Sequence, residues 1–288
     1  MTLIISVLTE QYVALMSDRR ITWIQDKKIK RQEDSDTKTF NLFGQFLMGF
    51  TGVARIDGWR IERWAMEIFR GVPTSEYFDV LSREITAVFR RNDASGKVPH
   101  AFHAVGYAGF KPGGRVYPLS VTVSNSLDKQ GMFSPEALGD SFRTFIEPLG
   151  NRRQMVRSVG WPMRQTTQRA LSHRLRVVAK GDATNPALSV GPLLMALRDT
   201  ARVSKEHVGK AALFASLPRS AVPSPGMAMG QIDYRRQAAS LFIPETAHGA
   251  GEGILYMPAI INPNLMIAGI KMYSGMPKEP LGQEEGFS

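Results

Sequence analysis

The second residue of the 288-residue chain is a threonine, which becomes a distinctive chemical group if Met1 is removed. Removal of an initiator methionine is common where the next residue is small, and it would leave Thr2 with a free α-amine beside its own hydroxyl. An α-amine has a reference pKa of about 7.7 to 8.0, so it can act as a general base near neutrality. A threonine activated in this way is an established nucleophile. Because many chains begin Met-Thr, the residue type alone also fits an ordinary N-terminus.

Composition and spacing argue against several other chemistries. The chain has no cysteine, which excludes a cysteine nucleophile, thiolate metal ligands, iron–sulfur clusters and disulfides. His100 and His103 lack a third ligand at metal spacing, which favours an ordinary packed or surface pair, and no metal or cofactor is expected. The glycine-rich segment 248–253 neither follows a clear strand nor opens a clear helix, so we interpret it as a turn rather than a phosphate-binding loop.

The elements that would position Thr2 alternate between strands and helix pairs. Short apolar runs predict strands, and apolar residues at intervals of three and four predict amphipathic helices. The predicted order is strands at 3–7, 12–16, 39–43 and 45–50, helices at 54–70 and 75–89, strands at 101–107 and 115–123, a long helical stretch at about 140–179 with interruptions at 148–150 and 160–162, a helix at 192–204 and a strand at 208–216. This order predicts a layered α+β domain in which two sheets lie between two helical layers.

The first 52 residues carry a resemblance to a known family. Thr2 opens one apolar strand, Asp18 closes the next, Lys38 precedes a third, and the following strand leads into the glycine-containing segment 46–52. This arrangement resembles the start of proteasome β subunits and their bacterial relatives, which belong to the N-terminal-nucleophile hydrolase superfamily. The resemblance extends weakly to residue 217.

The resemblance implies a domain organisation. Residues 1–217 would form a proteasome-like hydrolase domain with the four-layer αββα sandwich of the superfamily. Residues 218–288 would form a C-terminal extension that contributes some strands and ends in a mobile segment. Length alone allows either one large domain or two ordinary ones.

The resemblance also implies roles for five residues. Thr2 would be the nucleophile, Asp18 the carboxylate and Lys38 the buried cation beside the hydroxyl. Gly49 falls in the segment whose backbone N–H the family uses as an oxyanion hole, and Ser158 in the segment whose serine supports the α-amine. Here that segment reads Ser-Val-Gly rather than the family's Gly-Ser-Gly. The rival interpretations are that Asp18 is a turn residue paired with Arg19 or Arg20, and that Lys38 is an ordinary solvated cation.

The function implied is that of a threonine-type hydrolase that cleaves peptide or amide bonds once Met1 has been removed. It would act within a ring or double ring of identical subunits on peptides or unfolded proteins, and an ATPase partner is left open. One alternative is a catalytically inactive proteasome-like assembly or interaction protein. A second, from another class, is a basic nucleic-acid-binding protein.

Positive charge is concentrated in one part of the chain. Lys and Arg exceed Asp and Glu by 36 to 26, a net charge of +10, and residues 152–180 hold eight cations and no acidic residue. A solvated helix face or ion pairs between subunits are favoured over nucleic acid, which is not expected as a partner. The absence of a secretory leader and of an apolar run of about 20 residues favours a soluble, cytoplasmic protein without a membrane span.

Overall fold

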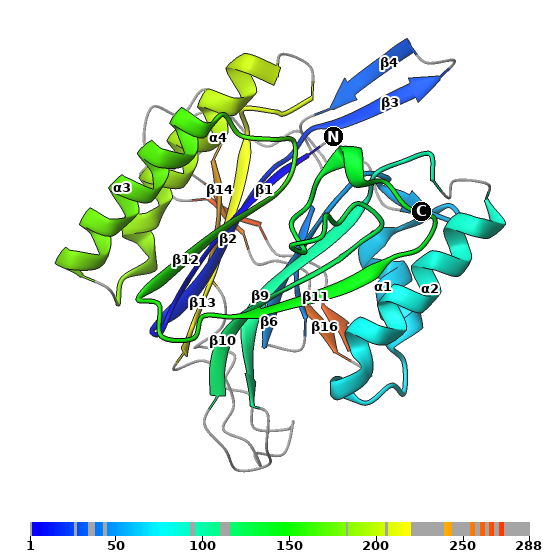
Figure 1. Ribbon diagram of the computed structural model, residues 1–288, viewed down its shortest axis with the longest axis horizontal. Coiled ribbons are helices and arrows are strands. Elements are labelled where there is room, and N and C mark those ends of the chain that lie inside the picture. Colours follow the sequence, from blue (N-terminus) through cyan, green and yellow to red (C-terminus); the bar gives the residue numbers. More distant parts are fainter. Residues whose placement is uncertain are drawn as a thin grey trace.

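Two large sheets and four helices make up most of the described part of the chain (Figure 1). The computed structural model describes residues 2–25, 28–33, 38–42, 45–92, 96–109, 116–182, 184–204, 207–219, 239–243, 254–256, 260–262, 265–267 and 271–273. The segments 220–238, 248–253 and 276–288 therefore lie outside the described residues, and with them the predicted glycine-rich turn and mobile end.

The first sheet is built around an N-terminal hairpin. Its strand order is β12-β1-β2-β13-β14-β15-β18, and all its pairings are antiparallel. The strands are β1 (Leu3–Thr9), β2 (Tyr12–Asp18), β12 (Gln154–Gly160), β13 (Ala212–Pro218), β14 (Ala239–Ile243), β15 (Ile254–Tyr256) and β18 (Lys271–Tyr273). Every residue of β1 and β2 is buried, as expected for strands that are covered on both faces.

The second sheet has the order β11-β10-β9-β6-β5-β16-β17, with only the β5–β16 pair parallel. Its strands are β5 (Thr39–Leu42), β6 (Phe46–Thr51), β9 (Ala101–Gly109), β10 (Val116–Ser124), β11 (Arg143–Pro148), β16 (Ile260–Asn262) and β17 (Leu265–Ile267). Two small hairpins pair β3 (Ile21–Gln25) with β4 (Lys28–Glu33), and β7 (Arg55–Ile56) with β8 (Trp59–Arg60). Strands from both sides of residue 217 thus share each sheet, and the division of the chain at that residue stays a prediction.

The helices are α1 (Ile61–Phe69), α2 (Tyr77–Arg91), α3 (Gln165–Gly181) and α4 (Val190–Ser204), with short 3-10 turns at η1 (Thr74–Glu76), η2 (Pro135–Ala137) and η3 (Pro186–Ser189). Alternation along β1 shows what each face meets. Leu3 and Ile5 pack in a core cluster with residues of α3 and α4, whereas Ile4 packs with residues of the second sheet. A third cluster joins α1 and α2 to the second sheet. None of the helices within the described residues is both long and apolar enough to cross a bilayer.

Most predicted elements are confirmed, but residues 55–60, predicted as the start of a helix, form β7 and β8, and the long helix at 140–179 is wrong. That stretch forms β11 and β12, and only then α3. Pro148 and Gly150 end the first strand, and Gly160 and Pro162 separate the second strand from the helix. Each strand lies at the edge of a sheet, where half-exposed residues give weak periodicity and pairing with a neighbour decides the structure.

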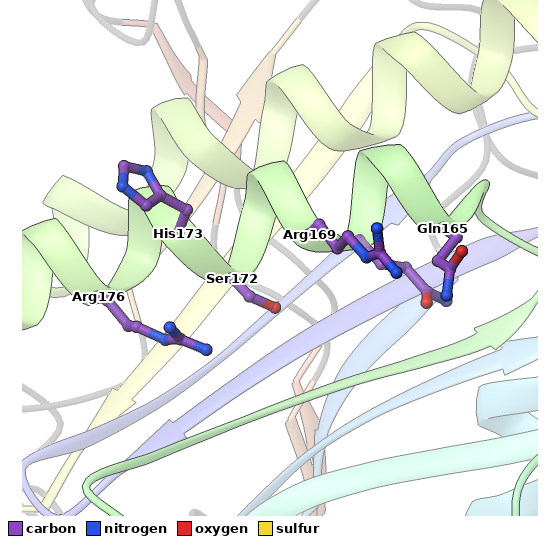
Figure 2. Close-up of a pocket in the computed structure, with 6 residues that line it drawn as sticks. Gln165, Arg169, Ser172, His173 and Arg176 are labelled. Carbon is purple, nitrogen blue, oxygen red and sulfur yellow. The ribbon is translucent and has the colours of Figure 1, made fainter.

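The basic stretch 152–180 is consequently divided between a strand and a helix. Arg152 and Arg157 both form ion pairs with Glu147 on β11. The cations of α3 form no ion pair with the acidic side chains of the described residues. The exposed face of this helix carries a hollow of about 440 Å³. Figure 2 shows polar side chains that project from this one helix and line the hollow: Gln165, Arg169, Ser172, His173 and Arg176. Gln168 of the same helix also lines it.

A buried histidine links the two sheets. On β9, His103 Nε2 lies 2.8 Å from Ser6 Oγ of β1, and its Nδ1 lies 2.9 Å from Thr122 Oγ1 of β10. Burial, with a smaller contribution from the charge of Arg157, lowers the pKa of His103 to about 3. The ring is therefore neutral at physiological pH, and both of its nitrogens have hydroxyl partners.

This histidine should make the fold sensitive to acid. Its pKa is about 3 in the folded chain, against about 6.5 when unfolded, so the unfolded state takes up the proton first as pH falls. The stability that His103 provides above pH 6.5 is thus lost toward pH 3, by about 1.4 kcal/mol per pH unit. We expect His103→Gln to flatten the pH dependence of the free energy of unfolding, measured in urea between pH 6 and 4, by that amount. His173→Gln, at an exposed position of α3, is the matched loss of one histidine and should leave the slope as in the parent.

Candidate active site

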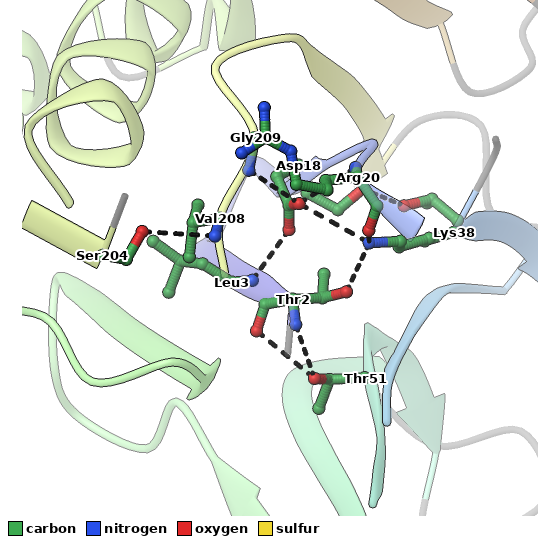
Figure 3. A network of polar contacts seen from close by, with 11 residues as sticks. Thr2, Leu3, Asp18, Arg20, Lys38, Thr51, Ser204, Val208 and Gly209 are labelled. Carbon is green, nitrogen blue, oxygen red and sulfur yellow. Dashed lines mark hydrogen bonds and ion pairs between the residues drawn. The ribbon is translucent and has the colours of Figure 1, made fainter. Parts of the chain in front are cut away.

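The side chains of Thr2, Asp18 and Lys38 meet at one end of the first sheet (Figure 3). Lys38 Nζ donates to Thr2 Oγ1 at 2.5 Å and lies 3.5 Å from Asp18 Oδ2. It also donates to the backbone carbonyl of Arg20. All three side chains belong to nearly buried residues, which expose 4%, 0% and 3% of their surfaces respectively. Three residues separated by up to 36 positions therefore share one small, water-poor site.

The hairpin register explains how these residues reach one another. Ile4 pairs with Ser17, so the next pair outward brings the start of β1 to the end of β2, where Asp18 lies. Lys38 precedes β5 in the second sheet, and the neighbouring Thr39 hydroxyl lies 3.0 Å from Ser17 Oγ. The site is thus formed where the hairpin of one sheet touches the first residue of a strand in the other.

Asp18 holds together three separate segments of backbone. Its Oδ1 accepts from the N–H of Leu3 at 2.8 Å, and its Oδ2 accepts from the N–H groups of Arg20 at 3.0 Å and Gly209 at 3.1 Å. With the Lys38 ammonium, this carboxylate has four donors. A buried charge is tolerated only with such a set of partners, so Asp18 is both a counter-charge to the lysine and an anchor for the loop around residue 209.

Sequence reasoning missed the groups that hold the backbone of Thr2. Its N–H donates to Thr51 Oγ1 at 3.1 Å, and its carbonyl accepts from Thr51 Oγ1 at 3.3 Å and from the N–H of Trp161 at 2.9 Å. At Gly160, φ is 99° and an added Cβ would lie 1.9 Å from the Thr2 carbonyl oxygen, so only glycine fits there. The alternation along β6, which turns residues 47, 49 and 51 toward the other sheet, is the signal that could have indicated Thr51.

Gly49 and Ser158 lie outside this group. Gly49 is in the middle of β6, opposite Thr39 and His103. The N–H of the next residue points to β5, where it donates to the Lys38 carbonyl, so the Gly49 N–H points to β9 and belongs to the sheet ladder. Ser158 pairs with Ile5 within β12, well before α3 begins. The structure places both residues near the site without bringing either to the Thr2 hydroxyl, and their roles stay predictions.

The arrangement can perform nucleophilic chemistry. A cation that donates to a hydroxyl stabilises the oxyanion formed when that hydroxyl loses its proton. The Thr2 nitrogen donates to the neutral Thr51 hydroxyl (Figure 3). No group of three or more His, Asp or Glu side chains that could hold a metal ion is found in the described part of the chain.

Replacement of the carboxylate should reveal how strongly this network supports the fold. We expect Asp18→Asn to lower the free energy of unfolding by about 3 to 5 kcal/mol in urea, because the amide leaves the ammonium unpaired and turns a donor toward other donors. Asp57→Asn is the matched control, since that carboxylate is exposed and its ion pair with Arg91 is on the surface; it should change stability by less than about 1 kcal/mol. Equal effects of the two substitutions would contradict the buried network.

Comparison with known proteins gives distant likenesses. No family model and no curated protein matches the sequence. Among solved structures, an Anbu Gly-1 mutant from Hyphomicrobium sp. strain MC1 is similar at 10% identity and a TM-score of 0.42, over 75% of this chain and 80% of that one. Anbu from Yersinia bercovieri, described as an ancestral beta-subunit, is similar at 10% identity and a TM-score of 0.44, over 75% and 81%. Likenesses of this size assign neither a family nor an activity to the chain.

Proposed function

We propose that this protein is an N-terminal-nucleophile hydrolase that cleaves amide bonds with Thr2 as its nucleophile. The observation that carries the proposal is the buried contact of Lys38 Nζ with Thr2 Oγ1, backed by Asp18. A lysine placed on a solvated surface would have no such partner, and a turn aspartate would not need three backbone donors. The rival interpretations of these residues do not account for the contacts.

In the proposed reaction, loss of Met1 frees the α-amine of Thr2. The amine takes the hydroxyl proton as Oγ1 attacks the substrate carbonyl carbon, and a C–O bond forms. The C–N bond then breaks, the leaving amine takes the proton from the α-ammonium, and an ester to Thr2 remains. Water, deprotonated by the same amine, attacks the ester carbonyl carbon. The C–O bond to Oγ1 breaks, Oγ1 takes the proton from the α-ammonium, and the carboxylic acid is released. Lys38 remains a cation throughout and stabilises the negative charge at Oγ1, while Asp18 balances the charge of Lys38.

The bend after Thr51 is the proposed source of oxyanion stabilisation. Gly52 follows Thr51 directly, lies beyond the end of β6 and has a φ of 107°. Its backbone N–H therefore lies outside the β6–β9 hydrogen-bond ladder, to which the N–H of Gly49 belongs. A preorganised N–H close to Thr2 is the kind of donor that stabilises a tetrahedral intermediate.

The proposal extends to the surroundings of the site. The order of core clusters, from α1 and α2 through the two sheets to α3 and α4, supports an αββα sandwich to which strands beyond residue 217 are added. Peptides or unfolded proteins are the proposed substrates, and a ring of identical subunits is the proposed assembly.

A mechanism-based probe tests this function directly. A peptide α′,β′-epoxyketone reacts first with a hydroxyl at its ketone and then with an adjacent amine at its epoxide, so it requires a free N-terminal threonine or serine. Intact-mass analysis should show loss of Met1 and one adduct in the parent, and no adduct in Thr2→Ala. We expect Lys38→Met to slow labelling about 100-fold or more, since it removes the charge that stabilises the alkoxide.

Lys210→Met is the matched control, because Lys210 is an exposed lysine that follows Gly209 in the sequence. This variant should be labelled at the parental rate. If the chain keeps Met1 and takes up no probe, the hydrolase proposal is contradicted, and the alternative of a catalytically inactive assembly protein is favoured.

The cationic face of α3 favours a second candidate function, binding of a nucleic-acid backbone. Arg169 and Arg176 line the hollow on this helix together with glutamine and serine side chains, which are the residue types that contact phosphates. We expect single-stranded DNA to bind with an affinity that falls with salt, and Arg169→Gln/Arg176→Gln to reduce the slope of log K against log salt by about 1.5.

Arg70→Gln/Arg83→Gln is the matched control for the loss of two charges, because each of these arginines is already paired with a glutamate. Fluorescence anisotropy with a labelled oligonucleotide measures both double variants. Equal losses in the two, or no binding by the parent at low salt, would exclude this function for the α3 face.

A further inference from the structure

His100 is a fully buried histidine for which the proposed reaction has no use. It lies just before β9, and its Nδ1 accepts a hydrogen bond of 3.1 Å from the backbone N–H of Val53. Val53 is two residues beyond Thr51, the side chain that holds both the nitrogen and the carbonyl of Thr2. A single stretch of three residues therefore connects the histidine ring to the backbone of the proposed nucleophile.

The ring is in direct contact with the bend itself. An added Cβ at Gly52 would lie 2.5 Å from His100 Nδ1 and 2.9 Å from the carbonyl oxygen of Pro99. With a φ of 107°, Gly52 already adopts a conformation that side chains disfavour. The bend is therefore fixed on one side by the Thr51 contacts to Thr2 and on the other by the imidazole.

The histidine is itself held in place by the end of β10. Its backbone N–H donates to Asn125 Oδ1 at 2.9 Å, and its carbonyl accepts from Ser124 Oγ at 2.7 Å. Asn125 also donates through Nδ2 to the carbonyl of Val98 at 2.9 Å. These bonds fix the backbone on both sides of the ring, so the position of Nδ1 is set by the second sheet.

Packing alone does not explain a histidine here. The ring lies among Phe89, Phe102 and Phe142, with centroids 4.9 to 5.9 Å away, where a phenylalanine would fit the chemistry of the surroundings better. Because Nδ1 accepts from an N–H, the neutral ring carries its proton on Nε2, and Nε2 has no hydrogen-bond partner among the described residues. A buried donor without a partner is unfavourable. Burial also lowers the pKa of His100 to about 3, which keeps Nδ1 an acceptor. The acceptor at Nδ1 is what distinguishes histidine from an aromatic hydrocarbon at this position.

We propose that His100 is a positioning residue for Thr2. Its Nδ1 fixes the bend of residues 51–53, and this bend holds the α-nitrogen of Thr2 beside the hydroxyl of the same residue. The inference rests on the proposed function, because it assigns the bend a role in presenting the amine. His100 itself touches neither substrate nor Thr2.

Three substitutions separate the acceptor from the ring. His100→Asn places an amide oxygen near the position of Nδ1 and lacks the ring. His100→Gln carries the same amide one carbon further out, where it cannot replace Nδ1, and His100→Phe keeps the ring without an acceptor. If the acceptor positions Thr2, the maximal rate of labelling by the epoxyketone should fall about 10- to 100-fold in the Phe and Gln variants. The Asn variant should stay within about 3-fold of the parent, and half-saturating probe concentrations should change little in all three.

Exchange of the Val53 amide with deuterium supplies a readout that does not depend on activity. We expect protection of this amide to be retained in the Asn variant and lost in the Phe and Gln variants. If the parent takes up no probe, the proposed function fails, while a protected Val53 amide would still show the hydrogen bond. If the parent is labelled and the Phe variant is labelled equally fast, the role of His100 is packing and the inference is overturned. Should the Phe variant not fold, equal labelling rates in the Asn and Gln variants would overturn it as well.

Discussion

A lysine ammonium and an aspartate carboxylate share a buried site where the two sheets meet, and the surrounding structure is arranged to satisfy them. Burial of two charges is unfavourable unless nearly every polar atom finds a partner. Asp18 meets this condition with donors from β1, from the bend at residue 20 and from the loop at residue 209. Lys38 meets it with the Arg20 carbonyl and the Thr2 hydroxyl. Because an apolar pair would be less demanding, the buried charges are accounted for by the role proposed for Lys38 at Thr2 Oγ1.

The parts of the site that could be predicted are those that depend on side-chain identity. Asp18 and Lys38 are chemically distinctive and follow apolar strands that are easy to identify, so a resemblance in residue order was enough to pair them with Thr2. Arg20 and Gly209 act through their backbone carbonyl and N–H. Since every residue type offers those groups, no sequence pattern distinguishes them, and only the folded chain shows which backbone atoms reach the charges.

The fold was predictable from the sequence where elements are covered on both faces. The prediction failed at the edges of the sheets. β1 and β2 are fully buried and read as continuous apolar runs. β11 and β12 are edge strands in which charged and apolar residues are mixed, and a basic sequence with few breaks suggested a helix instead. An ion pair between Glu147 of β11 and Arg157 of β12 joins the edges of the two sheets. This is a tertiary interaction that local periodicity does not report.

The placement of the lysine bears on the amine as well as on the hydroxyl. A fixed positive charge beside Thr2 disfavours a second positive charge nearby, so it should lower the pKa of a freed α-amine and increase the fraction of its basic form near neutrality. The Thr2 nitrogen meets the uncharged hydroxyl of Thr51. A carboxylate in that position would have the opposite effect on the amine. In the proposed reaction one cation thus favours the oxyanion of the nucleophile and the neutral form of its base together, provided that the bend carrying Thr51 holds the nitrogen beside the hydroxyl whose proton it takes.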